Sequence, residues 1–226
     1  MFVIDMARIT CAGIILCWFL SGAVQAMEMP ACLSPGKGTT PEAVISGNRM
    51  GDEELLARLV YAEGMSTGFG DDVLVSEAIA WGVMNRVRLG DVSPRMRRAY
   101  GRSIRGVIFK KGQFNPAVSE KSVFSRSFVC PDHPARWSMA RKAAARAVRG
   151  EGNPFLQTPW EKESGLSLVV NFYYPQSSQA KGPLPPWEES KALVFIGDVK
   201  IEGRTLSADR VRFYRLTRPP GDWQDK

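Results

Sequence analysis

The chain has 226 residues, which suits one domain with short appendages and leaves room for a substantial core. Its content of 44% apolar and 23% charged residues is close to the globular average, which excludes disorder along the whole chain. The formal net charge of +7 suits an anionic partner, such as nucleic acid, a membrane surface or an acidic polymer. The single histidine, His133, excludes sites that need two or three imidazoles.

Residues 1–26 predict a signal peptide. An apolar segment of about a dozen residues follows Arg8, and it is short of the roughly 20 residues that cross a bilayer. Val24 and Ala26 occupy the small-residue positions that precede signal-peptidase cleavage. We therefore expect an exported protein, periplasmic or associated with the cell wall. An uncleaved N-terminal anchor is the alternative.

Two cysteines, Cys32 and Cys130, remain after this cleavage. In an exported chain such a pair most simply forms one disulfide, which would tie the start of the mature chain to the middle of the fold. A catalytic Cys130 with His133 as its base is the less favoured interpretation, because both residues lie in one proline-flanked turn.

Residues 27–50 predict an irregular N-terminal arm, and residues 51–226 predict a single folded domain. In that domain Asp52 is the expected cap of a first helix that stops at Gly64. A second helix, apolar on all sides in its middle, is the expected buried centre and should end before Gly90. The predicted helices span residues 52–63, 71–89, 103–109 and 135–148.

The last third of the domain has a different pattern. Residues 168–174, 192–196 and 211–214 are rich in β-branched and aromatic residues and lie between turns rich in Gly and Pro. They predict strands. The expected fold class is therefore α+β, mainly α, with a small antiparallel sheet in the C-terminal third.

Glu63 falls in line with Leu56, Leu59 and Val60 on the apolar face of the first predicted helix. A glutamate is rarely buried unless it is paired or has a function. Burial would raise its pKa and keep it protonated near neutral pH, which is the state that a general acid needs. Two interpretations stay open: a general acid, or a carboxylate satisfied by an arginine or by backbone amides.

A polar loop at residues 112–116 offers two amide side chains and an exposed aromatic ring, which suit sugar hydroxyl and acetamido groups. Aromatic residues at the end of the first predicted strand could stack on sugar rings. Ordinary turn chemistry and core packing are the alternatives for the two sets. The predicted substrate-binding residues are Gln113, Phe114, Asn115, Tyr173 and Tyr174, with Trp187 as a further aromatic candidate.

Other patterns carry less weight. Residues 64–68 match G-x-S-x-G, but a helix and not a strand is predicted before them. The arginines between residues 95 and 105 predict a solvated basic face, so nucleic acid is not an expected partner. No HExxH, CxxC, P-loop or G-x-G-x-x-G motif occurs, so neither a metal nor another cofactor is expected.

The order of motifs resembles one known family. Residues 56–63 are similar to the opening motif of the SleB-type cell-wall hydrolases, the family of the spore cortex-lytic enzymes. The family's later motifs are matched in order, so the resemblance covers about residues 55–216. They are Asn-Arg at 85–86, Gly-Gln-Phe at 112–114, Phe-Tyr-Tyr-Pro at 172–175 and Phe-Tyr-Arg at 213–215.

The resemblance implies a lysozyme-like, mainly helical fold that cleaves peptidoglycan glycan strands between N-acetylmuramic acid and N-acetylglucosamine. Glu63 matches the family's catalytic glutamate, and Gln113 and Phe114 match its cleft motif. The chain departs from the family at residues 64–67, where a second acid is missing, and at Asn171 and near Val211, where the family often has histidine.

The lack of a second acid favours a lytic transglycosylase, in which one glutamate acts as acid and then as base. A hydrolytic N-acetylmuramidase, which needs a second carboxylate, is one alternative. A catalytically silent peptidoglycan-binding protein is another. Glycan strands are the expected partner in each case, while association with the membrane or wall surface and the oligomeric state stay open.

Overall fold

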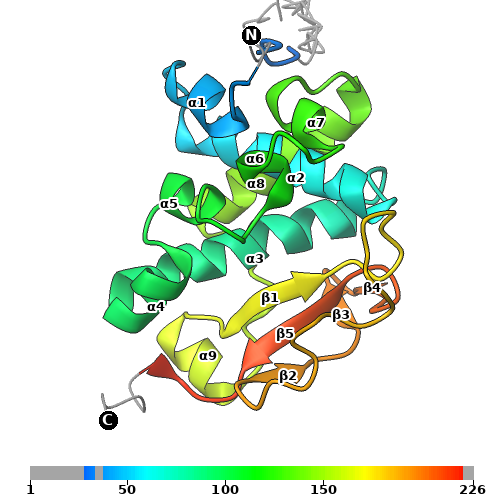
Figure 1. Ribbon diagram of the computed structural model, residues 1–226. Coiled ribbons are helices and arrows are strands. Elements are labelled where there is room, and N and C mark those ends of the chain that lie inside the picture. Colours follow the sequence, from blue (N-terminus) through cyan, green and yellow to red (C-terminus); the bar gives the residue numbers. More distant parts are fainter. Residues whose placement is uncertain (1–27, 34–37, 221–226) are drawn as a thin grey trace, which may run out of the picture.

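The structure is a computed structural model that describes residues 28–33 and 38–220, and the predicted signal peptide lies outside them. The described residues confirm an α+β fold that is mainly α, with the strands in the C-terminal third (Figure 1). None of the described helices is long and apolar enough to span a membrane. The helices are α1 (Pro41–Ser46), α2 (Asp52–Thr67), α3 (Val73–Val92), α4 (Pro94–Tyr100), α5 (Ile104–Ile108), α6 (Asn115–Val118), α7 (Ser125–Val129), α8 (Pro134–Arg149) and α9 (Pro159–Ser164).

Helices α2, α3 and α8 pack together and hold most of the core, with α3 running through the middle of the molecule (Figure 1). Strand β1 lies against α3, which joins the helical part to the sheet. The sheet is antiparallel in the order β1-β5-β2, and β3 and β4 form a separate hairpin. The strands are β1 (Val169–Tyr173), β2 (Leu193–Phe195), β3 (Val199–Ile201), β4 (Arg204–Leu206) and β5 (Arg212–Leu216).

Helix α2 differs from its prediction at both ends. Gly51 and not Asp52 is the N-cap, and Asp52 becomes the first acidic residue of the helix. Gly64 does not stop the helix, which continues for another turn to Gly68 in the left-handed conformation (φ 81°). The Thr67 hydroxyl donates to the Gly64 carbonyl oxygen over 2.7 Å, so Gly64 is held inside the last turn. The true stop is the glycine that adopts positive φ.

Helix α3 also passes its predicted end. Asp72 caps it by accepting a hydrogen bond from the Leu74 N–H, and Gly90 lies inside it. A Cβ on Gly90 would lie 1.9 Å from the carbonyl oxygen of Gly101, so glycine is required there by the close approach of the backbone after α4. A glycine that marks a close contact was therefore mistaken for one that ends a helix.

The N-terminal arm is not irregular throughout, which corrects the prediction for residues 27–50. Residues 41–46 form α1, with Thr40 as its N-cap. The Cys32–Cys130 disulfide is present, and the Leu33 N–H donates to the Val129 carbonyl oxygen. Residues 32–33 of the arm are thus fixed to the end of α7.

Candidate functional site

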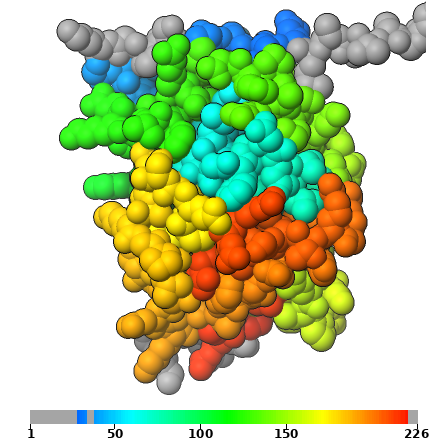
Figure 2. All heavy atoms as spheres, turned by 90° about the vertical axis from the view of Figure 1, so that its right-hand side faces the viewer, coloured from blue at the N-terminus to red at the C-terminus, as the bar shows by residue number. Residues whose placement is uncertain are grey.

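Glu63 lies near the C-terminal end of α2, where its side chain is 5% exposed. That small exposed part faces a cavity of about 410 Å³. The cavity lies between α2 and α3, the loop around residues 112–116 and the segment that follows β1. In Figure 2 this segment, in yellow, lies against the cyan end of α2, and Ser66 and Ser177 meet there at 3.3 Å between their hydroxyls. The helix end and the segment after β1 therefore form adjoining walls.

Burial raises the pKa of Glu63 from 4.5 to about 7. The nearby Tyr174 hydroxyl and the Arg86 charge oppose this rise. Among the described residues, however, neither group forms a hydrogen bond of ordinary geometry or an ion pair with the carboxyl. The buried Tyr174 hydroxyl interacts with the Glu63 carboxyl and has no other hydrogen-bond partner there. Glu63 is thus a largely desolvated acid that holds its proton up to neutral pH.

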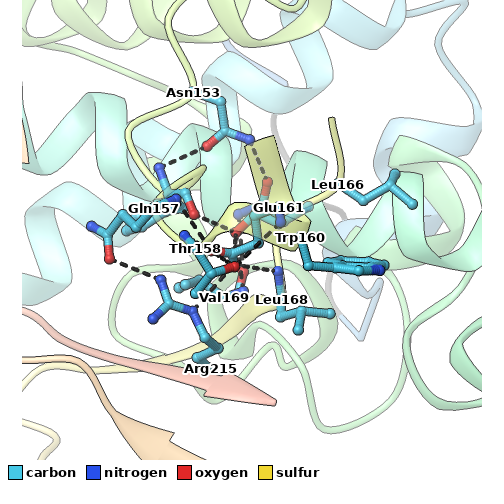
Figure 3. Close-up of polar contacts among 12 residues, drawn as sticks. Asn153, Gln157, Thr158, Trp160, Glu161, Leu166, Leu168, Val169 and Arg215 are labelled. Carbon is cyan, nitrogen blue, oxygen red and sulfur yellow. Dashed lines mark hydrogen bonds and ion pairs between the residues drawn. The ribbon is translucent and has the colours of Figure 1, made fainter. Parts of the chain in front are cut away.

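Glu161 in α9 shows what a satisfied buried glutamate looks like in this molecule (Figure 3). It is fully buried, and its two oxygens accept six hydrogen bonds. Burial raises the pKa of Glu161, but the backbone N–H groups of Thr158 and Leu168 and the Arg215 charge outweigh it, so the pKa lies below its ordinary value. Glu63 lacks such partners, which favours the general acid over the structural interpretation.

Arg86 in α3 is the buried cation of the cavity. Its Nε donates to the Val170 carbonyl oxygen over 2.5 Å, and its Nη1 donates to Gln113 Oε1 over 2.7 Å. Its guanidinium carbon lies 4.8 Å from the ring centre of Phe114 and 5.0 Å from that of Phe172. Burial lowers the Arg86 pKa to about 10, so the side chain keeps its charge at neutral pH.

Four of the five predicted substrate-binding residues line the cavity with Glu63: Gln113, Asn115, Tyr173 and Tyr174. Phe114 does not. Its ring is 1% exposed and packs on Arg86 and Phe172, so the expectation of an exposed ring is wrong. The reason is local: Phe114 is the N-cap residue of α6, and the chain there turns its side chain into the core while its neighbours face the cavity.

Tyr173 and Trp187 form an aromatic pair on the cavity wall. Their ring centres lie 6.2 Å apart at nearly right angles, and the Tyr173 hydroxyl donates to the Gly182 carbonyl oxygen. The indole Nε1 of Trp187 is buried and has no partner in the described part of the chain. The further aromatic candidate thus belongs to the same wall as Tyr173.

The sequence pattern did not identify Arg86 as a site residue, since an arginine near a helix end is expected to face solvent. Its position in the sequence could have identified it, because Arg86 falls among the apolar residues of a helix that is buried on all sides. Glu63 was identified in the same way, as a charged residue at an apolar position. Other lining residues left out of the predicted site are Ser66, Tyr100, Asn171, Ser177 and Gln179.

Glu63 is the one acidic residue among the described residues that line the cavity. The acids nearest to Glu63 along the following stretch of chain have other partners. Asp71 pairs with Arg136, Asp72 caps α3, and Glu77 pairs with Arg146. Within the described ranges, no group of three His, Cys, Asp or Glu residues could hold a metal ion. The chemistry of this wall therefore centres on one carboxyl.

Comparisons of the chain with protein families, curated proteins and solved structures gave no match. The likeness to the SleB-type hydrolases therefore stands on its motifs, and the lysozyme-like fold that it implies stays a prediction.

Proposed function

We propose that the protein cleaves peptidoglycan glycan strands between N-acetylmuramic acid and N-acetylglucosamine as a lytic transglycosylase, with Glu63 as general acid and base. One observation carries the proposal: a single desolvated carboxyl, which accepts no hydrogen bond of ordinary geometry among the described residues, faces an open cavity and has a pKa of about 7. A general acid works best when its pKa lies near the working pH.

In the proposed reaction, protonated Glu63 gives its proton to the glycosidic oxygen, and the bond from that oxygen to C1 of the muramic acid breaks. The electron pair stays on the oxygen, which becomes the 4-hydroxyl of the departing N-acetylglucosamine. The 6-hydroxyl of the same muramic acid then bonds to C1 and returns its proton to the Glu63 carboxylate. The products are a 1,6-anhydro end and a new non-reducing end, and no water is consumed.

A hydrolytic mechanism requires a second carboxylate, about 5 Å from the first in retaining enzymes and roughly 6.5–9.5 Å away in inverting ones. No described residue lining the cavity other than Glu63 could fill this role. The transglycosylase needs no second acid, because the substrate supplies its own nucleophile. The presence of a single acid at the cavity thus favours transglycosylation over hydrolysis.

The rest of the cavity wall supports a carbohydrate substrate. Amide side chains can bond to hydroxyl and acetamido groups, and aromatic rings can pack on the apolar faces of sugars. The wall offers both kinds of group within one cavity. The amides are Gln113, Asn115, Asn171 and Gln179, and the aromatic residues include Tyr100, Tyr173 and Trp187.

The test is mass spectrometry of the soluble products after incubation of the mature protein with purified sacculi. The proposal predicts products that end in 1,6-anhydromuramic acid. Products with reducing ends would instead identify a hydrolase, and binding to sacculi without release of products would identify a silent binding protein.

A further inference from the structure

The cavity wall beside Glu63 carries N–H groups that have no hydrogen-bond partner among the described residues. Arg86 uses Nε on Val170 and Nη1 on Gln113, which leaves its Nη2 without a partner. An arginine has only donors. Gln113 must therefore meet Arg86 with its oxygen, and this orientation leaves the Gln113 Nε2 group for the cavity that both residues line.

Asn171 on β1 repeats this arrangement. The Tyr100 hydroxyl donates to its Oδ1 over 3.3 Å, so its Nδ2 group stays without a partner in the part of the chain that the structure describes. Asn171 and Tyr100 line the same cavity as Gln113. In both Gln113 and Asn171 the amide oxygen thus accepts a hydrogen bond from another side chain, and the amide N–H groups stay available to a ligand.

The donors are held in place before any ligand binds. The Arg86 guanidinium is fixed by its two hydrogen bonds and by the rings of Phe114 and Phe172, so it in turn fixes the Gln113 amide. Fixed donors that need no rearrangement bind an oxygen acceptor more strongly than mobile ones. This part of the wall, at Arg86 and Gln113, is therefore arranged to receive an oxygen acceptor.

We propose that Arg86, Gln113 and Asn171 form a donor subsite that binds a carbonyl or carboxylate oxygen of the substrate. This inference rests on the proposed function, and a glycan strand offers two such groups. One is the acetamido carbonyl carried by each sugar. The other is the lactyl carboxylate of muramic acid, which is free only where no stem peptide is attached.

The test measures the binding of Glu63→Gln protein, which is expected not to cleave, to peptide-free glycan strands by titration calorimetry. The strands are used as prepared, after removal of their acetyl groups, and after amidation of their carboxylates. Glu63→Gln/Gln113→Glu keeps an oxygen for Arg86 but replaces the cavity donor with an acceptor. Gln157 is the matched control, since its Oε1 accepts from Arg215 Nη2 over 2.8 Å but lies outside the cavity.

The subsite predicts that Gln113→Glu weakens binding about tenfold or more, while Gln157→Glu changes it by less than about twofold. It also predicts that one of the two strand modifications weakens binding by a similar factor, with no further loss when Gln113→Glu is present. The modification that shows this coupling identifies the bound group. This strand comparison uses folded Glu63→Gln protein, so it holds even if Gln113→Glu proves unstable.

Equal binding of all strands by the Glu63→Gln protein overturns the subsite, as does an unchanged affinity in Gln113→Glu. If the wild-type protein still releases anhydro products in that case, the proposed function stands and only the subsite falls. If the protein neither binds strands nor releases products, both fall together.

Discussion

Glu63 and Glu161 are both buried, yet their carboxyls are accommodated in opposite ways. Glu161 accepts six hydrogen bonds and has a lowered pKa, whereas Glu63 accepts none of ordinary geometry among the described residues and has a pKa raised to about 7. The first arrangement stabilises the α9 region as an ion, and the second keeps a proton available at the cavity. Glu161 thus has a structural role, whereas Glu63 is the proposed general acid. Variants of the two residues can distinguish these roles.

Glu161→Gln should destabilise the fold and spare the proposed chemistry. The amide would place a donor against groups that donate to the carboxylate, and it would leave the half-buried Arg215 without its charge partner, at a cost of roughly 3 kcal/mol. Chemical denaturation measures this loss. A variant as stable as the wild type would show that the six hydrogen bonds contribute little.

The stability of the fold should depend on pH through Glu63. Its folded pKa lies above its unfolded value, so its contribution is complete below about pH 4.5 and is lost as the pH rises to about 7. The rise from 4.5 to about 7 corresponds to about 3 kcal/mol. Glu63→Gln should remove this dependence and be more stable than the wild type at pH 8. Parallel stability curves for the two proteins would contradict a protonated Glu63.

Tyr174→Phe should move the alkaline limit of activity to higher pH. The Tyr174 hydroxyl lowers the Glu63 pKa, so its removal lets the acid keep its proton further into the alkaline range. The pH profile of product release from sacculi measures this limit. Tyr173→Phe is the control, because that hydroxyl bonds to the Gly182 carbonyl oxygen, and it should leave the limit in place whatever it does to the rate.

Reduction of the Cys32–Cys130 disulfide should destabilise the protein. The bond joins residues 98 positions apart, and a loop of this length is worth about 5 kcal/mol by the chain-entropy argument. Thermal unfolding with and without a reductant measures the loss, with Cys32→Ser/Cys130→Ser as the control that no longer responds. An unchanged Tm would mean that the arm contributes nothing through this bond.

Sequence periodicity was sufficient for the long elements and for Glu63. The helices around residues 52–63 and 135–148 follow the apolar period, and a carboxylate within that period is conspicuous. The β3–β4 hairpin escapes the pattern because each strand has three residues and no aromatic residue, unlike the equally short β2, which contains Phe195. The ends of α2 and α3 were misplaced because a glycine can end a helix, tolerate one or admit a neighbouring backbone, and only the fold distinguishes these roles.

The candidate site was predicted in the same uneven way. Gln113, Asn115, Tyr173 and Tyr174 were identified as polar or aromatic residues near turns, and they do meet at one cavity. Phe114 was assigned to the wrong side, because a single residue in a loop has no periodicity to show which way it points. Arg86 was missed because its role depends on partners 27 and 84 residues away along the chain.

The most direct test of the central claim compares Glu63→Gln with the wild type on purified sacculi by mass spectrometry of the released products. A transglycosylase with Glu63 as its acid should release anhydromuramyl products as the wild type and about a hundredfold to ten-thousandfold fewer as the variant, since no other described acid faces the cavity. The folded state of the variant is checked by its Tm. Undiminished release of the same products by folded Glu63→Gln protein would contradict the account.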